Sequence, residues 1–211
     1  MTNGVEEDGP VETVVGVRYA ARGLGPLEFV QVYDMVISSA VGHRYWRFID
    51  QAPTFREFMA RTDGAAVEAA VFPVDRPDEI VAYLTIENLD PHAGSASVSV
   101  VVRPDYQSVT RALAETLFIG MNLAFGQMGL RVLYFEVADG LIPGLDRLID
   151  RWDCVLDEAR LFANQRVGDE WRDLRILSVF RKGFEADYPR MVQLLSGARA
   201  NSDAAEQLTR T

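Results

Sequence analysis

Hydrophobic and polar positions change their period near the middle of the chain. Residues 95–102 place serine at every second position and end in three consecutive valines, a pattern typical of a buried strand. Pro104 lacks the backbone donor that a sheet requires, so it ends this strand. Beyond it, a stripe of mostly apolar side chains recurs every three or four residues and predicts about five to six turns of helix. The stripe consists of Val109, Leu113, Thr116, Leu117, Gly120, Leu123, Ala124 and Met128.

The same periodicities predict further strands and helices on both sides of this segment. Runs of apolar and β-branched residues indicate strands at 13–20, 65–74 and 79–89, and an antiparallel hairpin at 159–184 that turns at 167–169. Helical spacing indicates helices at 26–40, 53–62 and 186–198. Pro53 is expected to begin the second helix and Gly197 to end the third.

The length of 211 residues and the hydrophobic content of 48% predict one globular domain with a core that needs no covalent cross-link. We expect this domain to span residues 12–196, between mobile polar tails at 1–11 and 197–211. The acidic N-terminus has no apolar core segment, and no 18-residue apolar run is present to span a membrane. A cytoplasmic protein is therefore expected.

The charge balance narrows the range of partners. A net charge of -10 disfavours nucleic acid and anionic membrane surfaces, and it favours a cationic partner such as a protonated amine. The single cysteine, Cys154, excludes an intramolecular disulfide and is expected in the core because it lies in the apolar run Cys-Val-Leu. Two histidines without metal-ligand spacing predict no metal site.

The turn between residues 102 and 109 has a further property. The first backbone N–H groups of a helix have no partner within the helix and lie at the positive end of its dipole, so such a turn favours a phosphate. The sequence RPDYQSVTRALAETLFIGMNLAF also resembles the central motif of the GCN5-related N-acetyltransferases (GNAT), in which Q/R-x-x-G-x-G/A follows a strand. Gln107 and Ala112 match the first and last motif positions, and Thr110 replaces a glycine.

The resemblance covers residues 12–184 and is closest to the ribosomal-protein N-acetyltransferase branch. It adds a strand at 131–139 and a helix at 140–153. The fold that it implies is an α/β (α+β) GNAT fold with a mixed, mostly antiparallel sheet of about seven strands flanked by helices. It also allows a homodimer.

The resemblance implies acetyl-CoA as the acyl donor. The strands at 95–102 and 130–139 would splay apart, so that pantetheine amides bond to the backbone of Val100, Val101 and Val102. The pyrophosphate would lie at the turn formed by Gln107, Ser108, Val109, Thr110, Arg111 and Ala112. The Ser108 and Thr110 hydroxyls and the guanidinium fork of Arg111 are able to donate to phosphate, although a β-branched residue is also able to obstruct its approach.

Amine acetylation needs a base that removes a proton from the ammonium group, and three side chains are candidates. Glu87, Asp90 and His92 lie near the end of the strand at 79–89 or in the connection that follows it. Each also has a structural interpretation, since Asp90 and His92 flank Pro91 in a predicted turn and Glu87 is a strand-end charge.

A cluster of rings and cations follows the helix at 26–40. Tyr45, Trp46 and Arg47, beside His43, either line the acceptor pocket or form a half-buried edge of the core. The sequence leaves both interpretations open.

Two functions remain. The first is transfer of an acetyl group from acetyl-CoA to a primary amine of a small molecule or protein by direct attack. The second is a catalytically inactive or repurposed GNAT-like scaffold that binds a small molecule or a protein. Three departures from the family pattern favour the second: Thr110 at the glycine position, Leu141 where an asparagine is common, and no evident acid tyrosine near 151–154.

Overall fold

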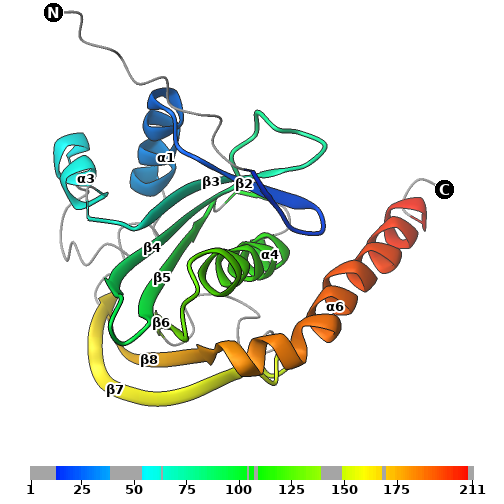
Figure 1. The fold of residues 1–211 in the computed structure, drawn as a ribbon. Coiled ribbons are helices and arrows are strands. Elements are labelled where there is room, and N and C mark those ends of the chain that lie inside the picture. The colour runs from blue at the N-terminus through cyan, green and yellow to red at the C-terminus, as the bar shows by residue number, and fades with distance from the viewer. Residues whose placement is uncertain are drawn as a thin grey trace, which may run out of the picture.

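The computed structural model of the protein describes residues 13–38, 54–62, 64–103, 105–106, 109–138, 149–167 and 170–208. In these ranges the strands form one eight-stranded sheet in the order β1-β2-β3-β4-β5-β6-β8-β7 (Figure 1). The strands are β1 (Val14–Val15), β2 (Tyr19–Gly23), β3 (Val67–Pro73), β4 (Ala82–Asp90), β5 (Ser95–Val102), β6 (Val132–Ala138), β7 (Val155–Val167) and β8 (Glu170–Phe180). The helices are α1 (Pro26–Ser38), α3 (Phe55–Thr62), α4 (Val109–Asn122), the π-helical turn η1 (Leu123–Gln127) and α6 (Arg181–Leu208).

All neighbouring strands in this sheet are antiparallel except β5 and β6, which are parallel. The mixed sheet with flanking helices confirms the expected fold class. The sequence predicts a single strand at 13–20, and this prediction is wrong. The chain forms two strands there, β1 and β2, which accounts for the eighth strand. Gly16 donates a backbone hydrogen bond to Tyr19 at 2.8 Å, which closes a tight hairpin between β1 and β2. A Cβ at Gly16 would lie 3.1 Å from the Tyr19 carbonyl oxygen, so glycine permits this turn.

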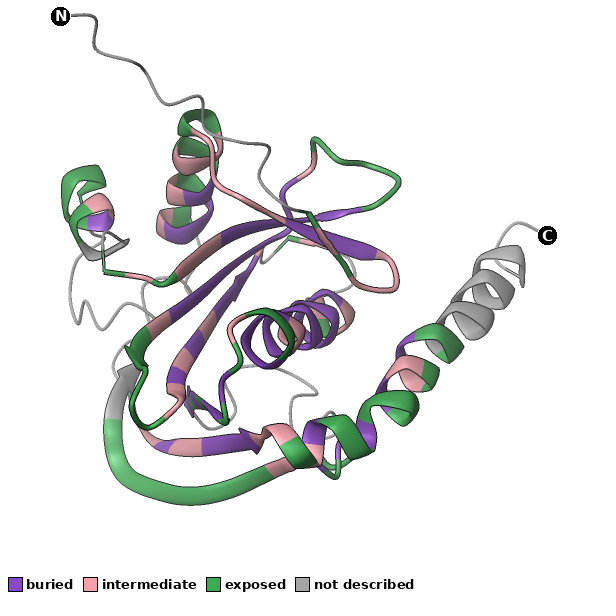
Figure 2. Ribbon diagram, viewed as in Figure 1, coloured by how far each residue is buried: buried purple, intermediate pink, exposed green. Residues whose placement is uncertain are grey.

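Two hydrophobic clusters lie on opposite faces of the sheet. Leu84 and Ile86 of β4 belong to the larger cluster, which α4 and α6 complete. Tyr83, which lies between Ala82 and Leu84 of the larger cluster, belongs to the smaller cluster with side chains of α1 and α3. Figure 1 shows α1 and α3 on one side of β3–β5 and α4 on the other, and Figure 2 shows the buried stripe along α4. We call these sides the α1 face and the α4 face.

The long central helix is confirmed. It begins at Val109, and η1 extends it to Gln127. Gly129 then adopts a φ of +71°, and Leu130 donates its N–H to the Ala124 carbonyl. Glycine is favoured at such a left-handed position at the end of a helix. The chain is thereby directed from the helix into β6.

Gly120 is the point where α4 comes closest to the sheet. A Cβ there would lie 3.1 Å from Leu84 Cδ1 and 3.4 Å from Val98 Cγ2. We expect Gly120→Val to lower the free energy of unfolding by about 2 kcal/mol, since the added methyl groups overfill a close-packed contact. Chemical denaturation measures this. The matched control is Gly126→Val, whose Cβ has no neighbour within 4 Å and which should change stability by less than about 0.5 kcal/mol. An equal loss in both variants would contradict the packing argument.

The C-terminal part of the chain departs from the prediction. The hairpin turn is confirmed, because β7 ends at Val167 and β8 begins at Glu170. The expected helix end at Gly197 is wrong, because α6 continues through it to Leu208. A single interior glycine costs a helix only about 1 kcal/mol and does not force it to end. The domain limits and mobile tails stay predictions. None of the helices in the described ranges is long and apolar enough to cross a membrane.

Candidate functional site

Strands β5 and β6 pair along only a short part of their length. Their parallel register comprises three pairs, Ser95 with Val132, Ala96 with Leu133, and Ser97 with Tyr134. Beyond Ser97, β5 continues to Val102 beside β4, and β6 continues to Ala138 beside β8. Residues 98–102 and 135–138 therefore turn backbone edges toward each other without pairing. We call this region the β5–β6 parting. It confirms that the two strands splay apart.

The valines of β5 are buried on both faces of the sheet. Val100 and Val102 belong to the cluster on the α4 face, and Val101 belongs to that on the α1 face. Because their side chains are occupied by packing, only the backbone of these three residues is available to a ligand in the parting. This is the type of contact that the sequence predicts for them.

A row of polar side chains crosses the closed end of the parting on the α1 face. The sheet register aligns Glu87 of β4 with Ser97, Ser97 with Tyr134 of β6, and Tyr134 with Ser178 of β8. The neighbours Ala96, Leu133 and Phe135 lie in the cluster on the α4 face, so alternation places the row on the other face.

The structure separates the three candidate bases. Glu87 is half-buried, and its Oε1 accepts a hydrogen bond from Ser99 Oγ at 2.8 Å. Ser99 is the first serine of β5 beyond the last β5–β6 pair, so this bond orients the Glu87 carboxylate at the parting.

Asp90 and His92 lie at the N-terminal end of β5, where this strand is still paired with β6. Asp90 Oδ1 accepts the backbone N–H groups of His92 and Ala93, both at 2.9 Å, in the turn that precedes Ser95. The His92 side chain is exposed there. The described geometry brings Glu87, but not Asp90 or His92, to the β5–β6 parting.

The helix N-terminus that follows β5 is described in part. Gln107 and Ser108 lie outside the described residues. Val109 begins α4 and is half-buried, Thr110 is exposed, and Ala112 is fully buried. Burial raises the pKa of Tyr19 well above the usual range of tyrosine, and the charge of the half-buried Arg111 opposes this rise only in part.

Aromatic and cationic contacts that the sequence analysis missed hold the chain between β5 and α4. The hydroxyls of Tyr106 and Tyr19 lie 3.1 Å apart, and their rings meet edge to face at 6.3 Å. Arg76 Nη2 donates to the Tyr106 hydroxyl at 3.4 Å, and Arg103 lies over its ring at 5.8 Å from the centroid. Tyr19 and Tyr106 are 87 positions apart, so no local pattern reveals their contact.

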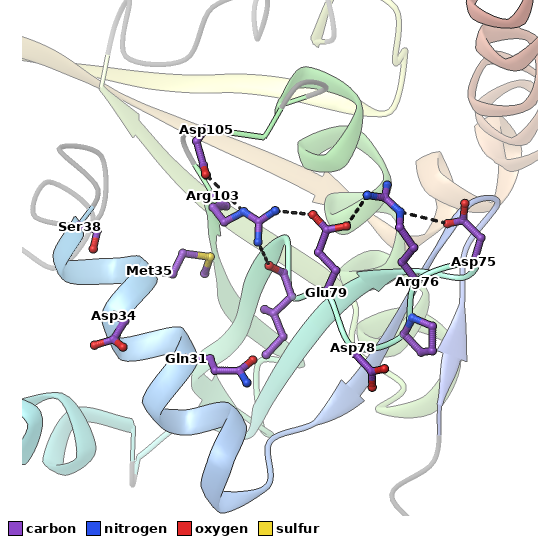
Figure 3. Close-up of a pocket in the computed structure, with 12 residues that line it drawn as sticks. Gln31, Asp34, Met35, Ser38, Asp75, Arg76, Asp78, Glu79, Arg103 and Asp105 are labelled. Carbon is purple, nitrogen blue, oxygen red and sulfur yellow. Dashed lines mark hydrogen bonds and ion pairs between the residues drawn. The ribbon is translucent and has the colours of Figure 1, made fainter.

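A cavity of about 1090 Å³ opens beside this connection (Figure 3). It lies between α1, the loop 74–81 after β3, and the residues that follow β5. Its lining carries five carboxylates and two guanidinium groups: Asp34, Asp75, Asp78, Glu79, Asp105, Arg76 and Arg103.

Both arginines of this cavity are already paired with its carboxylates. Arg103 bonds to Glu79 and lies 3.2 Å from Asp105, and Arg76 also bonds to Glu79. Five negative and two positive groups leave the lining with a net charge of -3, which favours a cation. The acidic turn Asp-Arg-Pro-Asp-Glu at 75–79 was the local signal for this cavity.

Some of the residues singled out in the sequence lie in parts of the chain that the structure does not describe. These are Tyr45, Trp46 and Arg47, as well as Leu141 and most of the helix expected at 140–153.

Other predictions concern described residues. Helix α3 begins at Phe55 rather than Pro53, because Thr54 and Glu57 form reciprocal capping bonds there. Cys154 is a core residue as predicted, and burial raises the pKa of its thiol to about 12. Among the described residues, no group of three or more acidic, histidine or cysteine side chains is arranged to hold a metal ion.

No protein-family model matches the sequence, and no curated protein matches it either. Solved structures do match the fold. The spermidine N-acetyltransferase of Vibrio cholerae, in complex with CoA and spermine, superposes with a TM-score of 0.66 at 15% identity, covering 79% of this chain and 98% of that one. A GCN5-related N-acetyltransferase from Brucella melitensis gives 0.61 at 17% identity, covering 90% of this chain and 86% of that one.

A GNAT-family acetyltransferase from Bacillus anthracis gives a TM-score of 0.61 at 14% identity, with coverage of 81% of this chain and 99% of that one. The protein therefore has the fold of the GNAT acetyltransferases. At these identities the likeness defines the fold, and the activity has to be argued from the site.

Proposed function

We propose that the protein is an acetyl-CoA-dependent N-acetyltransferase that transfers an acetyl group to a primary amine of a small molecule or protein. The observation that carries this proposal is the β5–β6 parting. Its unpaired backbone edges at Val100, Val101 and Val102 suit the amides of a pantetheine arm, which bonds to a strand as another strand would.

The phosphates of acetyl-CoA would lie where β5 leads into α4. Backbone N–H groups at the start of α4 and its dipole favour an anion there. Gln107, Ser108, Val109, Thr110, Arg111 and Ala112 form the proposed pyrophosphate turn. Arg111 supplies its positive charge, and the exposed position of Thr110 lets its hydroxyl face the phosphate from solvent.

Glu87 is the proposed base. The amine must lose a proton before or during its attack on the thioester carbonyl, and a carboxylate within reach, directly or through one water, accepts it. Ser99 holds the Glu87 carboxylate at the parting, whereas His92 lies in the turn at the far end of β5. The rate would come mainly from the orientation of amine and thioester and from a strand N–H that polarises the thioester oxygen.

The acceptor is proposed to be cationic before it reacts. The protein carries a net charge of -10, and the lining of the cavity beside α1 carries -3. A protonated amine is attracted by both. Tyr45, Trp46 and Arg47 stay proposed contacts of the acceptor, and the cytoplasm and a homodimer stay the proposed location and assembly.

One feature favours the alternative of a repurposed scaffold. Thr110 occupies the position of a motif glycine, and a β-branched side chain limits how closely a phosphate approaches the backbone. A scaffold of this kind would bind a small molecule or a protein without transferring an acyl group.

Calorimetric titration with acetyl-CoA tests the choice. We expect micromolar binding that Arg111→Ala weakens about tenfold, since one charge-assisted bond to a phosphate contributes about 1.5 kcal/mol. Arg56→Ala, at an exposed position of α3, is the matched control and should bind as the wild type does. The absence of heat, together with an unchanged melting temperature in saturating CoA, would exclude the acetyltransferase and leave the scaffold.

A further inference from the structure

A pair of tyrosine hydroxyl groups holds the connection between β5 and α4. Tyr106 lies directly before the proposed pyrophosphate turn, and its hydroxyl lies 3.1 Å from that of Tyr19 on β2. Tyr19 is only 4% exposed and belongs to the core cluster on the α4 face, against which Tyr106 packs. A hydroxyl at the border of a core needs a hydrogen-bond partner, so each of these two groups orients the other.

The Tyr19 side of this hydroxyl pair is anchored to the body of α4. The backbone N–H of Tyr19 donates to Glu115 Oε2 at 3.2 Å, and Glu115 is a fully buried residue of α4. The position of Tyr19 is therefore fixed relative to the helix. Through the hydroxyl pair, the chain that enters the helix is held against the same helix.

Two arginines fix the Tyr106 side of the pair. Arg76 Nη2 donates to the Tyr106 hydroxyl at 3.4 Å, and the guanidinium of Arg103 lies over the Tyr106 ring, 5.8 Å from its centroid. The Tyr106 N–H also donates to the Arg103 carbonyl at 3.1 Å. Glu79 pairs with both arginines and so holds the two cations in place (Figure 3). Tyr106 is thus oriented through its backbone, its ring and its hydroxyl.

The proposed pyrophosphate turn depends on its side chains because it contains no glycine. Thr110 occupies the glycine position, and Arg111 supplies the positive charge of the turn. The charge of Arg111 acts on Tyr19, where it opposes the rise in pKa that burial causes. Because such an effect weakens with distance, the Arg111 guanidinium lies close to the hydroxyl pair. A change in the pair therefore reaches the side chain on which a bound phosphate depends most.

We infer, on the basis of the acetyltransferase function above, that the hydroxyl pair of Tyr19 and Tyr106 positions Arg111 for the pyrophosphate of acetyl-CoA. Both tyrosines are positioning residues, since their hydroxyls bond to each other and act on the cofactor only through Arg111. The pair orders the entry into α4 before the cofactor arrives. Affinity increases because less conformational freedom remains to be lost on binding.

Calorimetric titration with acetyl-CoA in a double-mutant cycle tests this inference. Tyr106→Phe keeps the ring and removes the hydroxyl, and we expect it to weaken binding about fivefold, the contribution of one neutral hydrogen bond. Arg111→Ala alone should weaken binding about tenfold. The double variant should also lose only about tenfold, because no guanidinium is left to position, whereas independent effects would multiply to about fiftyfold.

Two further variants complete the test. Tyr19→Phe removes the other hydroxyl, so it should cause a similar loss and the same lack of additivity with Arg111→Ala. Tyr188→Phe is the matched control, since Tyr188 on α6 is 38% exposed and packs against Phe118 away from the pair. It should bind acetyl-CoA as the wild type does. The melting temperature establishes that each variant folds.

The outcomes separate this inference from the function on which it depends. If the wild type binds acetyl-CoA and both Tyr106→Phe and Tyr19→Phe bind it equally well, the pair has only a structural role, even where the melting temperature falls. Losses that multiply with that of Arg111→Ala would also overturn the inference, because the hydroxyls would then act elsewhere. In both cases the acetyltransferase proposal stands. If the wild type binds no acetyl-CoA, both proposals are overturned.

Discussion

Replacing Glu115 by alanine should lower the free energy of unfolding by about 3 kcal/mol. Glu115 lies on α4 and has no solvent-exposed surface. Its Oε2 accepts three consecutive backbone N–H groups, from Val17 at 3.1 Å, Arg18 at 2.7 Å and Tyr19 at 3.2 Å. Alanine would leave these donors without their acceptor, and each hydrogen bond to a charged group contributes about 1.5–3 kcal/mol when counted singly.

Chemical denaturation measures the loss, and two further variants define its cause. Glu115→Gln keeps an acceptor oxygen of the same reach and should lose less stability than the alanine variant. Glu185→Ala, at an exposed position of α6, should change stability by less than about 0.5 kcal/mol. Equal losses in Glu115→Ala and Glu185→Ala would show that the hairpin between β1 and β2 does not depend on this carboxylate.

The buried carboxyl group of Glu115 should also make the stability of the protein depend on pH. Burial raises the pKa of Glu115 above its ordinary value, although the three N–H groups act in the opposite direction. Its Oε1 is buried without a hydrogen-bond partner among the described residues, so it is the oxygen suited to carry a proton.

A raised pKa means that the folded state holds a proton that the unfolded state has released. Stability should therefore fall as the pH rises from the ordinary pKa of glutamate to the raised one, and stay level above it. Unfolding curves of the wild type and Glu115→Gln over this pH range measure how the difference between their free energies of unfolding changes with pH. A wild type that gains stability relative to Glu115→Gln as the pH rises would reverse the sign and contradict the assignment.

Local periodicity located most elements of the fold, whereas the strand that became β6 was predicted from the family resemblance. The change from a valine-rich strand to three- and four-residue spacing located β5 and α4, because each pattern depends on neighbours within one element. Local periodicity failed where one residue determines whether a strand or a helix ends. Gly16 breaks the first strand because of a close contact with the Tyr19 carbonyl, whereas Gly197 leaves α6 intact.

The candidate site depends on contacts that no local pattern contains. Three register pairs between β5 and β6 define where the parting begins, and they join residues nearly forty positions apart. Sequence alone therefore ranked Glu87 and His92 equally, and the sheet register separates them. The sequence did not single out Glu115, because the backbone N–H groups that its carboxylate binds lie almost a hundred positions away.

The alignment of Glu87 with the parting leads to the largest expected effect on activity. Glu87→Gln should lower kcat for amine acetylation at least about a hundredfold, since general-base catalysis contributes about 10²–10⁴. Glutamine keeps an oxygen that accepts the Ser99 hydroxyl, so the KM for acetyl-CoA should stay the same.

Release of the CoA thiol, measured with a panel of primary amines that includes spermidine, provides the assay. His92→Gln changes the exposed side chain in the turn before β5 and should leave kcat within about twofold, because the turn is held by the Asp90 carboxylate and the backbone. A large loss in His92→Gln with full activity in Glu87→Gln would transfer the role of base to the histidine. Similar losses in both variants, with CoA binding intact, would show that neither side chain acts alone and that water carries the proton from the amine.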